Sequence, residues 1–153
     1  MRELKVQPIR NGTVIDHIPG GMALRVLGIL GIPKEGSTSS VSALISVPSK
    51  KTGLKDIVKV EDRELGPAEV CKIALIAPRA TINIVRNYGV IRKYAVTLPE
   101  IVEGIVSCGN PNCVSHNEPV SSRFRVISKD PPRLRCHYCE RELVGADIPA
   151  HLL

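Results

Sequence analysis

The stretches Cys108-Gly-Asn-Pro-Asn-Cys113 and Cys136-His-Tyr-Cys139 decide the fold of the C-terminal third of this 153-residue sequence. Each places two cysteines on a short turn, and 22 residues separate the two stretches. This spacing is typical of a tetrahedral site that offers four thiolates to one zinc ion. Four sulfur ligands complete the coordination sphere of Zn²⁺ and leave no position for water. The sequence therefore predicts one structural, non-catalytic zinc ion bound by Cys108, Cys113, Cys136 and Cys139.

Two other uses of these cysteines compete with zinc. Disulfides would need an oxidising compartment, whereas nothing at the N-terminus resembles a signal peptide and we expect a cytosolic chain. A CxxC redox pair would explain the second stretch but leave the first without a role. His116 and His137 could each replace a cysteine as a ligand, although four available thiolates favour a surface position for both. We therefore favour zinc.

The residues around the cysteines predict a small module of their own. Residues 101–153 contain one phenylalanine and one tyrosine. So short a segment rarely buries enough apolar surface to offset its conformational entropy unaided. A structural zinc ion supplies the missing free energy, about 10 kcal/mol. We predict two domains, residues 1–100 and residues 101–153, of which the second is a β-rich zinc ribbon.

The first domain carries signals for strands and helices in alternation. β-branched runs between turn residues indicate strands, and apolar residues at helical spacing beside prolines indicate helices. The expected order is a strand over 4–18 with a turn at 11–12, a helix over 22–30, strands over 41–47 and 55–60, a helix over 67–77, and strands over 80–85 and 90–94. This α+β order predicts a ferredoxin-like split βαβ sandwich, an antiparallel sheet with two helices on one face. Residues 97–99 are the expected linker.

The net charge of +6 is unevenly distributed. Residues 1–100 hold 15 Lys and Arg against 9 Asp and Glu, whereas residues 101–153 hold 6 of each kind. An anionic partner is therefore expected to meet the first domain. The sequence has no apolar run long enough to span a bilayer, so we expect no membrane partner.

Three lysines of the first domain stand out. Lys55 and Lys59 are four residues apart on one predicted strand, hence on the same face, and Lys93 lies in the last strand. A solvated sheet edge would explain them. However, Asp16 and His17 close a strand at the rim of the same domain. Because lysines neutralise phosphates while a carboxylate reads hydroxyls or a base edge, the set resembles an anionic small-molecule pocket.

The same residues make a poor catalytic set. Asp16 and His17 are adjacent on a strand and are expected to face opposite sides. The sequence contains neither a Walker loop nor a GxGxxG pattern. Cys71 lies among apolar neighbours and is expected to be a core residue rather than a nucleophile. We therefore predict a protein that is not an enzyme.

Several segments together resemble the regulatory chain of aspartate carbamoyltransferase. They are NGTVIDHIP at 11–19, KDIVKVE at 55–61, APRATINIVRNYGVIRK at 77–93 and PNCVSHNEPVSSRF at 111–124, with the cysteine spacing described above. The resemblance covers nearly the whole length and both domains in order. It implies a non-catalytic, cytoplasmic subunit of pyrimidine nucleotide biosynthesis.

The resemblance also implies partners and sites. The N-terminal domain would bind the nucleotide effectors CTP, ATP and UTP, the zinc domain would dock onto catalytic trimers, and regulatory chains would pair as dimers. The positions that match the effector pocket are Ile9, Val14, Asp16, His17, Lys55, Lys59, Asn83, Val85, Tyr88, Val90 and Lys93. The positions that match the catalytic-chain interface are Asn110, Asn112, Glu140 and Arg141.

The principal alternative is a nucleic-acid-binding zinc ribbon protein whose basic first domain contacts the RNA backbone. Against it, only 3% of the residues are aromatic and no evident pair on a strand could stack on bases. We accordingly expect no nucleic-acid partner. A small enzyme is a third reading, for which the sequence offers no catalytic constellation.

Overall fold

The computed structural model describes residues 9–32, 35–36, 38, 40–50 and 53–153, which form two compact units. The first unit holds residues up to 66 together with 79–95, and the second holds 67–78 together with 96–153. An antiparallel sheet with two helices precedes a small β-rich part with a cysteine cluster, as predicted for the α+β fold class. The domain boundary that we place near residue 100 stays a prediction.

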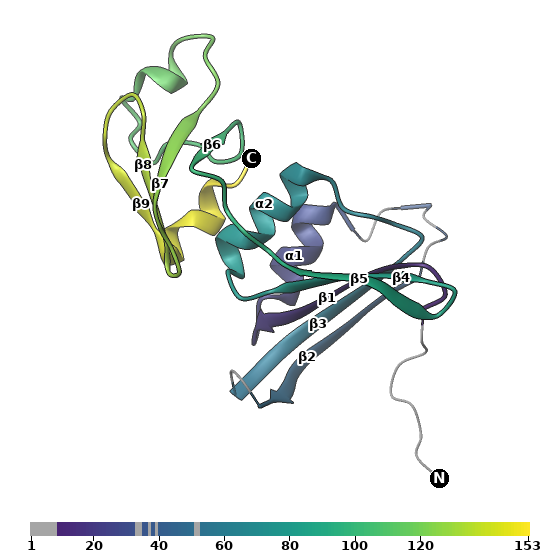
Figure 1. Cartoon of the computed structure of the whole chain (residues 1–153). Coiled ribbons are helices and arrows are strands. Elements are labelled where there is room, and N and C mark those ends of the chain that lie inside the picture. The colour runs from purple at the N-terminus through teal and green to yellow at the C-terminus, as the bar shows by residue number, and fades with distance from the viewer. Residues whose placement is uncertain (1–8, 33–34, 37, 39, 51–52) are drawn as a thin grey trace. The chain divides into compact units, whose positions relative to one another are not determined.

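The first unit is built on a five-stranded antiparallel sheet in the order β2-β3-β1-β4-β5 (Figure 1). Its strands are β1 (Gly12–Pro19), β2 (Val41–Ser49), β3 (Gly53–Glu61), β4 (Thr81–Arg86) and β5 (Gly89–Ala95). The four strands before β5 have the predicted split βαβ order. Residues 4–8 of the first predicted strand lie outside the described residues.

Helix α1 (Ala23–Leu30) covers one face of this sheet (Figure 1). Its buried side chains Val26 and Leu30 recur at helical spacing and meet the buried face of the strands, which includes Ile15, Val58 and Ile82. The helix ends at Gly31, whose left-handed φ of 70° lets its N–H bond the carbonyl oxygen of Gly28. The core of the first unit therefore lies on one side of the sheet and leaves the other face open.

The start of α1 is held by a buried carboxylate from β3. Met22 provides no side-chain cap, and Asp56, which is fully buried, takes this role instead. Its Oδ2 accepts hydrogen bonds from the backbone N–H groups of Gly21 and Ala23, each at 2.9 Å, and its Oδ1 accepts one from Ser46, also at 2.9 Å. Two N–H donors at the start of α1 and one from β2 compensate the buried charge.

Replacing Asp56 with alanine should therefore destabilise the chain by about 2–3 kcal/mol, because one buried and two part-buried N–H groups lose their acceptor. Urea unfolding of the zinc-loaded protein measures this loss. Asp56→Asn keeps one acceptor oxygen and should cost less. A cost for Asp56→Ala no larger than that of an exposed substitution such as Leu24→Ala would show that the carboxylate is dispensable.

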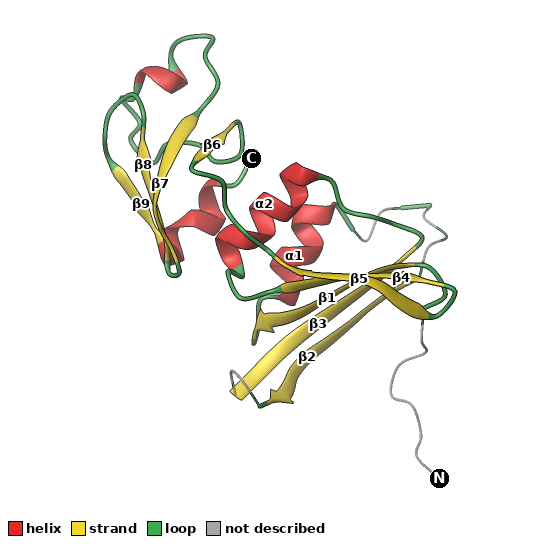
Figure 2. Cartoon of the chain, in the orientation of Figure 1, coloured by secondary structure: helices red, strands yellow, loops and turns green. Residues whose placement is uncertain are grey.

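The second unit contains a four-stranded antiparallel sheet in the order β6-β7-β8-β9 (Figure 2). Its elements are α2 (Pro67–Ile76), β6 (Ile101–Glu103), the 3₁₀ helix η1 (Val114–His116), β7 (Arg123–Lys129), β8 (Pro132–Cys136), β9 (Glu142–Val144) and the 3₁₀ helix η2 (Gly145–His151). The buried side chains Phe124, Leu134, Leu143 and Ile148 form its core. Val96 and Leu98, beside and within the predicted linker, are also buried.

Cys71 lies on α2 and is only half-buried, rather than fully buried as expected of a core residue. Burial still raises the pKa of its thiol, which lowers the fraction of reactive thiolate. This environment is that of an inert cysteine. Among the described residues, no helix is long and apolar enough to cross a membrane.

Candidate functional sites

The four predicted zinc ligands converge on one point. The Sγ atoms of Cys108, Cys113, Cys136 and Cys139 all lie within 4.8 Å of one another. Cys108 Sγ is 3.5 Å from Cys139 Sγ, and Cys113 Sγ is 3.7 Å from Cys136 Sγ. A tetrahedral zinc ion about 2.3 Å from each sulfur would set neighbouring sulfurs about 3.8 Å apart. The cluster fits one structural zinc ion.

Hydrogen bonds around the cluster outweigh burial and lower the pKa of the Cys113 and Cys139 thiols. Burial raises the pKa of the Cys136 thiol and raises that of Cys108 to about 12. The backbone N–H of Asn110 lies 3.4 Å from Cys108 Sγ, and the Ser115 hydroxyl donates to Cys113 Sγ at 3.1 Å. Burial would raise the pKa of the Cys139 thiol, but hydrogen bonds from the Arg141 backbone and the Asn110 side chain bring it down to about 7. Donors of this kind orient metal ligands and offset their charge.

The two nearby histidines lie outside the sulfur cluster, as predicted. His116 Nε2 lies 2.8 Å from the carbonyl oxygen of Cys108, which fixes the ring outside the sulfur cluster. His137 is exposed, and its ring meets that of Tyr138 edge-on at 5.1 Å. The ligand set is therefore the four cysteines.

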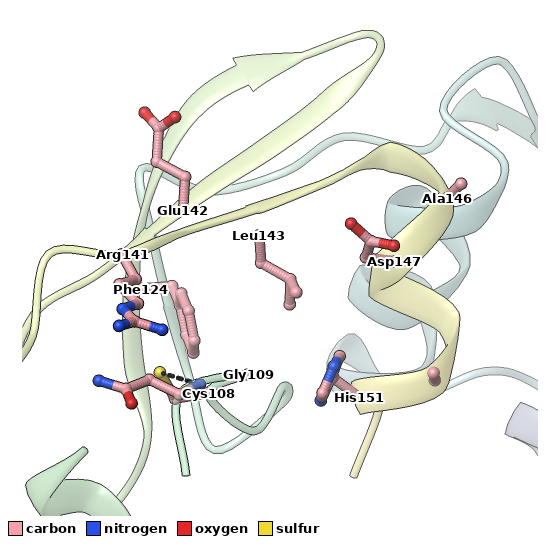
Figure 3. Close-up of a pocket in the computed structure, with 11 residues that line it drawn as sticks. Cys108, Gly109, Phe124, Arg141, Glu142, Leu143, Ala146, Asp147 and His151 are labelled. Carbon is pink, nitrogen blue, oxygen red and sulfur yellow. Dashed lines mark hydrogen bonds between the residues drawn. The ribbon is translucent and has the colours of Figure 1, made fainter. Parts of the chain in front are cut away.

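The knuckle face, which we define as Asn110, Asn112, Glu140 and Arg141, surrounds the zinc cluster. Asn110 Oδ1 accepts a hydrogen bond from the backbone N–H of Asn112 at 3.1 Å, which shapes the first turn. Glu140 has a left-handed φ of 63° that closes the second turn. Asn110 and Arg141 line a cavity of about 360 Å³ whose opposite wall is η2 (Figure 3). The structure thus brings all four residues to one end of the second unit.

The second site is the open face of the first sheet, opposite α1. Strand register places Lys59, Val14, Asn83 and Lys93 directly across from one another on β3, β1, β4 and β5. Cross-strand partners project from the same face. The Asn83 side chain also donates to the carbonyl oxygen of Val14 at 3.3 Å. Lys59 on β3 and Lys93 on β5, which are 34 positions apart in the sequence, therefore lie in one row across the sheet.

The lysines of this face differ in their partners. Lys55 Nζ forms a 2.9 Å ion pair with Asp16 Oδ1, and both side chains are largely buried. Within the described part of the chain, no ion pair engages Lys59 or Lys93. Their two positive charges lie on the face that the helix leaves open.

The prediction that Asp16 and His17 face opposite sides is wrong, because a β-bulge interrupts the alternation. The register between β1 and β3 shifts between Ile15 and Ile18, and His17 has a left-handed φ of 58°. His17 Nδ1 lies 3.1 Å from the Thr81 hydroxyl, and Thr81 is the cross-strand partner of Asp16. Both side chains therefore reach the same face.

The remaining predicted positions lie at one end of this face. Val85 is paired with both Gly12 and Val90. The hairpin between β4 and β5 turns at Asn87 and Tyr88, both with left-handed φ, and the Tyr88 N–H donates to the carbonyl oxygen of Arg10. That bond ties the residue after Ile9 to the hairpin. From here on, the open face means the predicted effector-pocket positions, of which Ile9 is the first and Lys93 the last in the sequence.

The Asp16–Lys55 pair predicts a pH dependence. Burial would raise the pKa of Asp16, but the hydrogen bonds from Lys55 and from the His17 N–H outweigh it and hold the pKa below its usual value. A lowered pKa stabilises the fold above the unfolded value near 4, and this stabilisation is lost as pH falls through the folded pKa. Urea unfolding between about pH 5 and pH 2 should therefore show a shallower acid-side decline for Asp16→Asn than for wild type. Equal slopes would contradict this.

Family comparison identifies the chain. A family model described as the allosteric domain of the aspartate carbamoyltransferase regulatory chain matches residues 4–97, and one described as its metal binding domain matches residues 100–149. This chain belongs to the aspartate carbamoyltransferase regulatory chain family. A regulatory chain from Pyrococcus horikoshii is 55% identical over 152 residues, which cover 99% of this chain and 100% of the relative. One from Methanothrix thermoacetophila is 60% identical over 144 residues, which cover 93% and 92%.

Membership of this family confirms three predictions. The chain is a regulatory, non-catalytic subunit of aspartate carbamoyltransferase. Its C-terminal part is a metal-binding domain, whose four cysteines fit one zinc ion. Its N-terminal part is an allosteric domain.

Two residues of the regulatory chain escaped sequence reasoning. Thr81 contacts His17 only because β4 pairs with β1, and a single sequence does not reveal that register. Asp56 could have been found, since it is a charged residue at a core position of the alternating stretch 55–60.

Proposed function

We propose that the open face binds the triphosphate nucleotides CTP, ATP and UTP and that this binding regulates the catalytic chain. The row of Lys59, Asn83 and Lys93 carries the proposal, because it sets two unpaired ammonium groups and an amide across one exposed face. Lysine ammonium groups bind phosphate oxygens as point charges. This row of two ammonium groups and one amide suits the triphosphate group of a nucleotide.

The bulged end of the open face suits the nucleoside. Asp16, whose charge Lys55 balances, can accept hydrogen bonds from ribose hydroxyls or a base amino group. His17 near the end of β1 and Tyr88 after β4 each add a ring, and the half-buried Val14 supplies apolar surface between them. One nucleotide would thus span the face from bulge to hairpin.

The knuckle face is the proposed contact with the catalytic chain. Three of its residues are exposed and Asn110 is half-buried, the cysteine cluster fixes its two turns, and it borders a cavity that a partner side chain could fill. In this proposal two regulatory chains pair as a dimer and join two catalytic trimers in the cytoplasm. The edge strand β2 offers exposed apolar side chains for such pairing, Val41 at 37% and Ile45 at 53% exposure.

A nucleotide can shift the catalytic equilibrium only by binding one quaternary state better than the other. Coupling free energies of this kind are typically about 1–3 kcal/mol. The zinc domain would transmit the difference because four metal bonds make the docked end rigid.

The test is the aspartate carbamoyltransferase activity of the cognate catalytic trimer. Activity is measured for the trimer alone and with this chain, with and without zinc and with and without CTP. A zinc-dependent complex whose activity responds to CTP is the expected result. A zinc-loaded chain that forms no complex would refute the docking role. A complex whose activity changes with none of the three nucleotides would refute the effector role.

A nucleic-acid-binding role remains the competing function. Saturable binding of one CTP per chain, at a salt dependence far shallower than that of RNA binding, supports the effector role. Tighter binding of single-stranded RNA than of any nucleotide would favour the competitor.

A further inference from the structure

The outward face of the zinc domain sheet carries a cluster of arginines. The inward residues of its two central strands, Phe124 and Leu134, are 1% and 0% exposed, so the alternate residues face outward. Arginine occupies four of these outward positions, namely Arg123 and Arg125 on β7 and Arg133 and Arg135 on β8. We call them the arginine face. The zero net charge of residues 101–153 conceals this cluster. Three acids lie near it: Glu142 on β9, Glu103 opposite Arg123 on β6, and Glu140 at a hollow that three of the arginines line.

The arrangement is electrostatically unfavourable within the chain itself. Arg125 is the direct cross-strand partner of Arg135, and like charges at such positions destabilise a sheet. Glu142 is shared between Arg133, at 2.6 Å, and Arg135, at 3.2 Å. No ion pair among the described residues engages Arg123 or Arg125. Arg125 therefore faces another arginine without an ion pair, and Arg123 lies opposite Glu103 on β6 but forms no ion pair with it, so both guanidinium groups are available to an external anion.

The surface has the shape and composition of a protein contact. Arg123, Arg125 and Arg135 line a hollow of about 380 Å³ with Ile101 and Glu140 at its border. Ile101 is 38% exposed, and Val144 on the same face is 44% exposed. Arginine beside aliphatic surface is typical of protein interfaces. The hollow offers little for stacking on nucleic-acid bases, because Phe124 is buried and His137 is the one exposed ring among its lining residues.

We propose that the arginine face binds an acidic segment of the catalytic chain, as a second contact beside the knuckle face. The inference rests on the proposed docking of the zinc domain and extends it. Glu140 belongs to the knuckle face and also borders the hollow, so the two surfaces are continuous. Each guanidinium can form two parallel hydrogen bonds with one carboxylate, which fixes the orientation of the partner as well as adding attraction.

The experiment compares variants of the full-length, zinc-loaded chain for binding to the cognate catalytic trimer. Arg123→Gln/Arg125→Gln should bind roughly tenfold or more weakly at low salt, and the gap to wild type should narrow above about 0.3 M salt. The matched control Arg10→Gln/Arg25→Gln removes the same charge from exposed positions of the first unit and should bind like wild type. Arg123→Lys/Arg125→Lys should restore part of the affinity. One zinc ion per chain in every variant establishes that the domain is intact.

The outcomes separate this inference from the docking role. If wild type binds the trimer and the glutamine variant matches its control at every salt concentration, the arginine face is not a contact, although the docking role stands. If zinc-loaded wild type forms no complex, the docking role fails and the inference with it. If the substitutions weaken binding of a 20-nucleotide oligouridine but not of the trimer, the surface serves nucleic acid and the inference is overturned.

Discussion

Cys113→Ser should abolish stoichiometric zinc binding and unfold the sheet β6-β7-β8-β9. Cys113 is 1% exposed and its sulfur lies 3.7 Å from that of Cys136, so serine leaves three thiolates around a vacant ligand position. A structural zinc ion contributes about 10 kcal/mol, more than the core around Phe124 and Leu134 can replace. Amide hydrogen exchange of the full chain should become fast across β7 and β8 and stay slow across β1 and β4.

The matched control is the same substitution at Cys71. That cysteine lies on α2 outside the cluster, so Cys71→Ser should retain one zinc ion per chain and slow exchange. The two variants should also differ in assembly, because the knuckle face is shaped by the two metal-binding turns. Slow exchange in β7 and β8 of a zinc-free Cys113→Ser chain would show that the apolar core alone suffices and that the metal is an accessory.

Periodicity and metal spacing were sufficient for most of this architecture. A strand with one buried face is recognised by alternating polar and apolar residues, as in Lys55 to Val60. Paired cysteines at this spacing indicate a zinc ion whatever the sequence between the pairs. What escaped depends on contacts between distant segments. The Asp16–His17 bulge arises where β1 meets β3, so a rule based on neighbouring residues placed His17 on the wrong face.

Charge shows the same limit more sharply. Counting residues 101–153 gives no net charge and predicts no anionic partner for the zinc domain. The fold, however, places four arginines on one face of the sheet, with Glu142 shared between two of them. The net charge of a segment does not say which way its charged side chains point. Their direction follows from strand alternation and register. The open face differs, because Lys55 and Lys59 lie on one strand and their common side follows from the sequence alone.

The open face leads to the second large expected effect, the loss of CTP binding by Lys59→Ala/Lys93→Ala. A hydrogen bond to a charged group is worth about 2 kcal/mol, so removing both lysines should weaken binding by about 4 kcal/mol, roughly a thousandfold in Kd. Lys55→Ala should cost less, because the Asp16 carboxylate already balances that charge at 2.9 Å. Titration calorimetry of CTP into the zinc-loaded chain gives these constants directly.

A control must separate a local phosphate contact from the overall positive charge. Lys50→Ala removes an equal charge from an exposed turn after β2 and should change Kd by about twofold or less, since salt screens distant surface charges. The ranking that follows from the geometry is a large loss for Lys59 and Lys93, a smaller one for Lys55 and almost none for Lys50. Equal losses at all four positions would mean that CTP senses only the net charge of the first unit. The row across the open face would then not be its binding site.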